Sequence, residues 1–187
     1  MSLTPAFEIG LWNAWIPVLY PQLIFIFGIL AKREMLKRGL PDYTKAERKI
    51  YRVISAMYYL AIVYSIFLPL ELGTVWFYIG LPIFLLGEVI FTLAAVSFGT
   101  TPIDKPVTRG IYHHSRHPLY LAQYLIFIGV SIASASWVFL LFAISFTILQ
   151  HILTIPEERT CLAKYSDSHR EYMNKTPKYI GRNKNGL

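Results

Sequence analysis

Five long apolar runs, rather than an amphipathic repeat, most constrain what this chain can fold into. The runs cover residues 11–31, 53–70, 72–98, 119–133 and 137–155. About 20 apolar residues are needed for a helix to cross a hydrocarbon core of about 30 Å. The sequence therefore predicts an all-α integral membrane protein with about five transmembrane helices, and we expect one domain over residues 1–187.

The last two runs are short, and the sequence Ser134-Ala135-Ser136 separates them. They are expected to form a helical hairpin, either as two tilted spans or as a pair that dips into the bilayer and returns. Both arrangements place Pro156 on the side of the membrane where Pro118 begins the fourth run. The sequence leaves the choice between them open.

The positive charges predict an orientation. All 18 Lys and Arg residues fall within residues 32–52, within residues 105–116 or after Pro156. The positive-inside rule then places the N-terminus outside and the basic loops and C-terminus on the cytoplasmic side. The basic residues that give the net charge of +7 lie next to the ends of the predicted spans, where anionic lipid headgroups are the nearest partners. We therefore expect membrane lipids, and no nucleic acid, as partners.

The first basic loop has the features of a helix start. Residues Thr44 and Glu47 have the spacing of a capping box, so the second helix is expected to begin before the bilayer. The single cysteine, Cys161, excludes an internal disulfide.

The second basic loop, residues 99–118, carries the candidate site. It contains Tyr112, two further histidines, Arg116 and His117, and Pro118 is expected at the first turn of the next helix. Zinc needs three or four ligands, and no second His- or Cys-rich segment supplies them. We therefore predict no metal site.

Helical spacing brings further polar residues to this end of the hairpin. Tyr120 follows His117 by three residues and shares its helix face, while Glu157 and Glu158 stand at the far end of the fifth run. Two adjacent carboxylates near a helix end face an unfavourable dipole. We expect a cation, from Arg116 or from a ligand, to stabilise them.

These motifs carry a resemblance. The segments 110–112, 116–120 and 156–159, with Tyr165 and residues 171–173 in the tail, resemble the isoprenylcysteine carboxyl methyltransferase family, and related membrane phospholipid methyltransferases share much of the pattern. The resemblance covers about residues 100–180. Ser166 replaces a common glycine and His169 a common aromatic residue, which puts the local turn of the tail in doubt.

The resemblance implies a methyltransferase that uses S-adenosylmethionine, with a cofactor pocket formed by the last two helices, the preceding loop and the tail. Arg116 and His117 suit the carboxylate of the cofactor, and Glu157 or Glu158 suits its amino group or ribose. Tyr112 and Tyr120 could face the sulfonium. The predicted cofactor-binding residues are Tyr112, Arg116, His117, Pro118, Tyr120, Glu157 and Glu158.

The methyl acceptor is expected to be lipidic or lipid-anchored. By resemblance, O-methylation of an isoprenylcysteine carboxylate is favoured, whereas an amine headgroup or a thiol remains an alternative that would need a base. Glu88, a carboxylate within the third run, and Arg116 are the predicted catalytic residues. A neutral, hydrogen-bonded structural role for Glu88 stays open.

Two other classes of protein remain as alternatives. A small transporter could use Glu88 and Gln123 as a pathway, but the sequence has no inverted repeat. Membrane sterol reductases, which bind a nicotinamide cofactor, are similar in the C-terminal half, but the chain is short for their larger helix set.

Overall fold

The computed structural model describes residues 8–31 and 41–181, and these form helices joined by short connections. The α-helices are α1 Trp15–Ala31, α2 Lys45–Ile66, α3 Val75–Thr100, α4 Pro118–Ala133 and α5 Trp137–Lys175. A short 3-10 helix, η2, covers Gly110–His113. The described residues contain no β-strand, only one isolated bridge, so the prediction of an all-α fold is confirmed.

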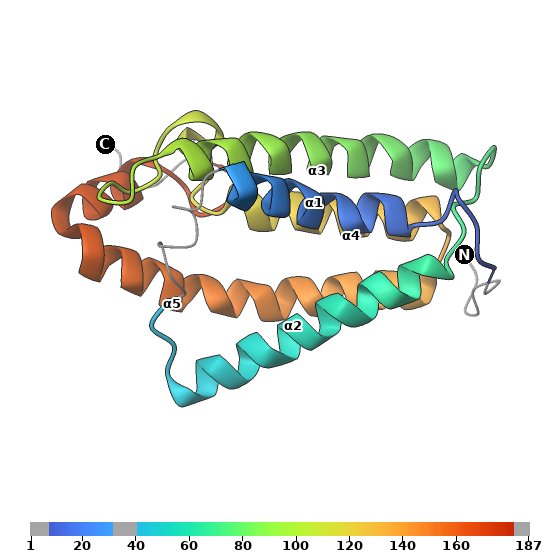
Figure 1. Ribbon diagram of the computed structural model, residues 1–187, viewed down its shortest axis with the longest axis horizontal. Helices are drawn as coiled ribbons and strands as arrows, with labels where there is room; N and C mark the ends of the chain where they lie inside the picture. The colour runs from blue at the N-terminus through green and yellow to red at the C-terminus, as the bar shows by residue number, and fades with distance from the viewer. Residues whose placement is uncertain (1–7, 32–40, 182–187) are drawn as a thin grey trace.

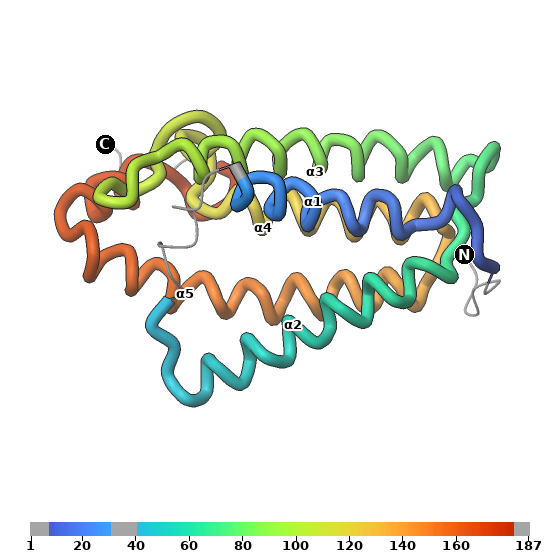
Figure 2. The backbone as a smooth tube through the Cα atoms, in the orientation of Figure 1, coloured from blue at the N-terminus to red at the C-terminus, as the bar shows by residue number. Residues whose placement is uncertain are grey.

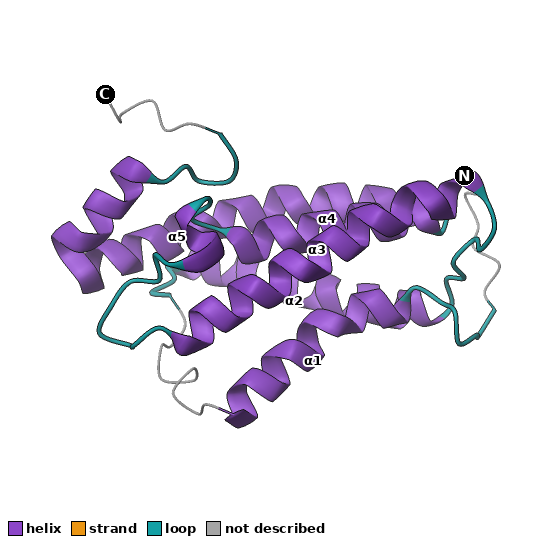
Figure 3. Cartoon of the chain, turned by 90° about the horizontal axis from the view of Figure 1, so that it is seen from above, coloured by secondary structure: helices purple, strands orange, loops and turns teal. Residues whose placement is uncertain are grey.

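The helices run along one long axis, with α2 oblique to α5 (Figures 1 and 3). Helices α3 and α4 make the closest contact. A Cβ added at Gly80 would lie 2.4 Å from the carbonyl oxygen of Gly129, and one added at Gly87 would lie 2.8 Å from that of Ala122. Small residues at these positions let the two backbones approach, as in many membrane bundles.

Two of the described helices, α3 and α5, are long and apolar enough to cross a membrane. The shorter helices Trp15–Leu30 and Pro118–Ala133 are also apolar. Large apolar side chains such as Leu60, Val89 and Leu141 are exposed on the outside of the bundle. Such a surface suits lipid chains better than water. The five-span topology and its orientation stay predictions.

The predicted start of α2 is confirmed. The hydroxyl of Thr44 accepts a hydrogen bond from the Glu47 amide at 3.3 Å, and the Glu47 carboxylate accepts one from the Thr44 amide at 2.8 Å. This capping box starts the helix eight residues before residue 53, where the apolar run begins.

The predicted hairpin is also confirmed. Helices α4 and α5 pack against each other, and residues 134–136 turn the chain between them. Ala135 has a φ of 47°, and the Ser136 hydroxyl caps α5 by accepting from the Phe139 amide at 3.2 Å. At this end, the Glu71 amide also donates to the carbonyl of Ala133.

Helix α5 continues 20 residues beyond the predicted span, through Pro156, and its axis breaks at Ser166. This residue has φ 48° and ψ −123°, a conformation that favours glycine. The turn that the glycine replacement put in doubt is therefore present. Figure 2 shows the last part of α5 lying beside the loop before α4. The Tyr165 hydroxyl donates to the carbonyl of Ile103 at 2.9 Å across this contact.

Candidate active site

The loop before α4 is held by the segment that follows α5. The Arg116 amide donates to the carbonyl of Pro177 at 3.0 Å, and the His117 amide donates to that of Lys178 at 3.2 Å. Pro118 occupies the first turn of α4, as predicted, where a missing amide proton costs nothing. The backbone that carries Arg116 and His117 is thus fixed from both sides.

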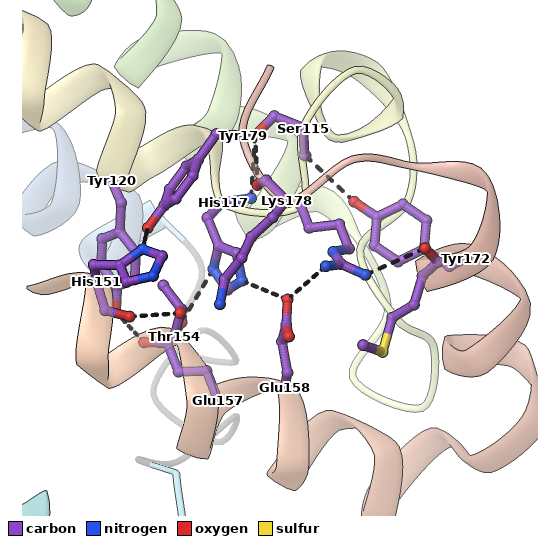
Figure 4. A network of polar contacts seen from close by, with 12 residues as sticks. Ser115, His117, Tyr120, His151, Thr154, Glu157, Glu158, Tyr172, Lys178 and Tyr179 are labelled. Carbon is purple, nitrogen blue, oxygen red and sulfur yellow. Dashed lines mark hydrogen bonds and ion pairs between the residues drawn. The ribbon is translucent and has the colours of Figure 1, made fainter. Parts of the chain in front are cut away.

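Glu158 of α5 lies between these two side chains. Its Oε1 is 3.0 Å from His117 Nε2 and 3.2 Å from Arg116 Nη2 (Figure 4). Burial opposes ionisation of Glu158, but the hydrogen bond with His117 and the charge of Arg116 hold its pKa below the usual value. Burial also disfavours charge on His117, and the hydrogen bonds with both glutamates outweigh it and raise the His117 pKa.

Glu157 forms the second half of the cluster. The Tyr120 hydroxyl donates to Glu157 Oε1, and His117 Nδ1 lies 3.6 Å from Glu157 Oε2. The rings of His117 and Tyr120 stack, with centroids 5.7 Å apart and planes within 4°. Burial and the charge of Glu157 raise the pKa of Tyr43, a second tyrosine that lines the same cavity as Glu157. The Glu157 side chain is 28% exposed, against 16% for Glu158, so Glu157 is the more accessible carboxylate.

These groups line a cavity of about 590 Å³. The volume is within the range of small-molecule sites, about 300–1,000 Å³. The apolar part of the lining includes Phe25, Ile54, Phe91, Phe98, Leu119 and Leu153. The site therefore combines a charged cluster with an apolar wall, which suits a charged ligand and a lipid chain together.

The residues predicted from the sequence meet here in large part. Six of the predicted residues line the cavity, namely Tyr112, Arg116, His117, Tyr120, Glu157 and Glu158. Pro118 is buried behind them and fixes the start of α4. They come from two parts of the chain, residues 110–120 and the middle of α5, and Figure 4 shows His117, Tyr120, Glu157 and Glu158 of this group close together in space.

A family model described as phospholipid methyltransferase matches residues 72–168, just over half of the chain. The chain belongs to the phospholipid methyltransferase family. No curated protein and no solved structure gives a significant match. The match makes this chain a membrane-associated methyltransferase, and it covers α3, α4 and the part of α5 that carries both glutamates. The family match does not establish the narrower assignment to the isoprenylcysteine carboxyl methyltransferases.

Within this methyltransferase, Glu88 stands apart from the other predicted residues. It is half-buried on α3 and does not line the cavity, to which α3 presents Phe91 and Phe98 instead. Thr92, one turn further on, pairs its hydroxyl with that of Tyr20 on α1 at 2.6 Å. The structure thus does not bring Glu88 to the carboxylate and cation cluster.

His169 is one of several residues that line the methyltransferase cavity although the sequence did not predict them as site residues. His169 is 6% exposed, and neither of its ring nitrogens has a hydrogen-bond partner in the structure. Burial lowers its pKa, so the ring is neutral near pH 7. Arg116 Nε is also buried without a partner. Buried polar atoms are normally hydrogen-bonded, so these atoms indicate that a ligand completes the site.

Pro41 and Tyr43 also line the cavity without having been predicted, and they flank Asp42, which an ion-paired arginine holds against α5. Arg159 donates to both carboxylate oxygens of Glu47, at 3.1 and 2.8 Å, and to the carbonyl of Asp42 at 2.7 Å. This contact with Arg159 lowers the pKa of Glu47 to about 2. No local sequence pattern predicts this contact, because it joins Arg159 to residues that lie more than a hundred positions earlier in the chain.

Proposed function

We propose that this protein transfers a methyl group from S-adenosylmethionine to the amine headgroup of a membrane phospholipid. One observation carries the proposal: a single cavity joins a charged cluster to an apolar wall in a chain of the phospholipid methyltransferase family. A charged cofactor and a lipid-held acceptor need such a site, because methyl transfer requires both in one water-poor space.

The residues present fit the cofactor. Arg116 keeps a buried Nε without a partner, which suits the cofactor carboxylate, and His117, whose pKa the two glutamates raise, is a second basic group beside it. Glu158 is placed to accept from an amino group or a ribose hydroxyl. The rings of Tyr112 and Tyr120 line the same space and suit a sulfonium. When bound, the cofactor supplies an electrophilic methyl group.

The neutral part of the cofactor suits the other side of the cavity. The adenine ring is flat and uncharged, and His169 and Tyr172, with ring centroids 5.7 Å apart, line the wall beside Arg116. A neutral imidazole offers one donor and one acceptor, which match the edge of a purine. We assign His169 to the cofactor on this ground.

Glu157 supports an amine as the acceptor. An ammonium headgroup would be attracted to this accessible carboxylate, which could then take its proton before transfer. The hydroxyl of Tyr120 orients the carboxylate. A carboxylate acceptor would instead meet repulsion from Glu157. Isoprenylcysteine O-methylation, favoured by the motif resemblance, is the second candidate, and thiol methylation would use the same base.

The test starts from purified protein in detergent. We expect calorimetric titration to detect binding of S-adenosylhomocysteine, whereas binding of NADPH alone would contradict the proposal and favour a reductase. Labelled S-adenosylmethionine is then offered with phosphatidylethanolamine, with a farnesylcysteine and with a lipophilic thiol. Label in the ethanolamine lipid is expected, and label only in farnesylcysteine would establish the second candidate.

A further inference from the structure

A second, smaller cavity adjoins the proposed active site. It measures about 200 Å³ and shares Ile54, Gln123 and Gln150 with the larger cavity. Its polar lining comes from four different helices and consists of Gln22, Ser55, Tyr58, Tyr59, Gln123 and Gln150. Part of this set is satisfied within the protein, since the Ser55 hydroxyl donates to the carbonyl of Tyr51 at 2.9 Å, so the argument for a ligand depends on a polar atom that has no such partner.

The two glutamines on α4 and α5 form the centre of this group. Gln150 Nε2 donates to Gln123 Oε1 at 2.6 Å, a contact that by itself could serve only to join the helices. Gln150 is 5% exposed, however, and its Oε1 has no partner in the structure. An unpaired buried acceptor is costly, so the helix contact leaves the site incomplete.

The position of the pair relates it to the reaction. Gln150 precedes Glu157 by seven residues, so both lie on one face of α5, about 10 Å apart along the axis at about 1.5 Å per residue. Gln150 lies on the side of Glu157 that leads into the apolar part of the bundle. A lipid whose headgroup reaches Glu157 would place the linkage between headgroup and chains near this pair.

We propose that Gln123 and Gln150 form a subsite for a hydrogen-bond donor, a hydroxyl or an amide N–H, in the linkage region of the acceptor lipid. This inference rests on the proposed function. The free group is an acceptor oxygen, which an ester carbonyl cannot satisfy but a hydroxyl can. The protein should therefore prefer a monoacyl lipid with a free hydroxyl, or a sphingolipid, over a diacyl lipid with the same headgroup.

The test compares lipids with the same headgroup that do or do not offer this donor. The first pair is 1-acyl-lysophosphatidylethanolamine and its 2-O-methyl ether, and the second is ceramide phosphoethanolamine and a diacyl phosphatidylethanolamine. We expect the wild type to show a KM about threefold to tenfold lower for the hydroxyl lipid of the first pair, the worth of one buried hydrogen bond. A preference in the second pair alone would assign the donor to the amide N–H or sphingoid hydroxyl.

Two variants connect the preference to the glutamines. Gln150→Met and Gln123→Met keep the chain length without an amide, and each should reduce the preference to about onefold while S-adenosylhomocysteine still binds. Ser145→Ala is the matched control on an exposed part of α5, and it should retain the wild-type preference. Equal KM values for both lipids of both pairs in the wild type would overturn the subsite.

Binding is measured separately from turnover. The shift in melting temperature caused by each lipid without cofactor tests the subsite even if no lipid is methylated. Absence of turnover with every ethanolamine lipid would count against the proposed function, and equal shifts from matched lipids would count against the glutamine subsite. The two failures are therefore distinguishable.

Discussion

The two ends of the helical bundle differ in whether their buried polar groups have hydrogen-bond partners within the protein. At the end that holds the hairpin turn, the Asn13 amide donates to the carbonyls of Glu8 and Ile66, and the Ser131 and Ser134 hydroxyls donate to carbonyls of their own helix. At the other end, His169 and Arg116 retain buried nitrogens without partners. Polar residues that only cap or join helices have hydrogen-bond partners within the protein. Polar residues of a binding site include groups whose partner is the ligand.

If this contrast is correct, substitutions at the cavity end should change binding and turnover, and those at the hairpin end should change stability alone. The largest effect is expected at Glu157. Glu157→Gln should reduce turnover by roughly 10²–10⁴-fold, the usual contribution of a general base, with cofactor affinity retained. The measurement is a turnover assay with the ethanolamine lipid beside a titration with S-adenosylhomocysteine.

Glu88→Gln sharpens the same experiment, because Glu88 lies off the cavity. We expect a mild loss of turnover there, through packing alone. A large loss for Glu88→Gln combined with a mild one for Glu157→Gln would reverse the assignment of the base.

Next in size is the effect on cofactor affinity. Glu158→Gln and His117→Ala each strand a buried charged partner, which costs about 1–3 kcal/mol and corresponds to roughly 5- to 150-fold weaker S-adenosylhomocysteine binding. Exposed Glu171, which pairs with Lys175, provides Glu171→Gln as a control that should bind normally. Normal affinity in both folded cluster variants would refute the proposed pocket.

The hairpin end should respond in the opposite manner. In Gly129→Ala the new Cβ would lie 2.4 Å from the Phe84 amide nitrogen, so α3 and α4 must separate. We expect a loss of about 1–3 kcal/mol in stability, seen as a lower melting temperature, with cofactor affinity per folded molecule unchanged. Leu85→Ala, at an exposed position of α3, should cost less. A change in cofactor affinity of Gly129→Ala without a change in its melting temperature would contradict the proposed difference between the two ends of the bundle.

The charge cluster also predicts a pH dependence. The His117 pKa is raised in the folded state, so its contribution to stability is complete below the unfolded value of about 6.5 and is lost as pH rises through the folded value. The Glu158 pKa is lowered, so its contribution is complete above about 4.3 and is lost as pH falls through the folded value. The difference in melting temperature between wild type and His117→Gln should therefore shrink at alkaline pH. A constant difference from pH 6 to pH 10 would show that His117 is not charged in the fold.

Sequence patterns could predict what depends on local spacing. Helix periodicity placed His117 and Tyr120 on one face, and the capping pattern at Thr44 located the start of α2. Contacts between distant segments left no such pattern. The ion pair of Arg159 and Glu47 joins residues that are 112 positions apart. Whether the ring nitrogens of His169 have hydrogen-bond partners depends on which distant residues the fold brings near them. His169, which in the sequence is only a departure from a family pattern, is thus a candidate for ligand binding in the structure.

The smallest effect is expected at the turn within α5, where Ser166 adopts a φ of 48°. A residue with a Cβ is strained by about 1–3 kcal/mol in such a sparsely populated backbone conformation, whereas glycine is not, although glycine loses more entropy on folding. Ser166→Gly should therefore raise stability by up to about 1 kcal/mol and leave cofactor affinity unchanged. Ser168→Gly is the matched control, because Ser168 is also exposed but lies in helical backbone, where glycine costs about 0.5–1 kcal/mol. Opposite shifts of the two melting temperatures would establish the turn, and a loss of stability in both would show that Ser166 is helical in solution.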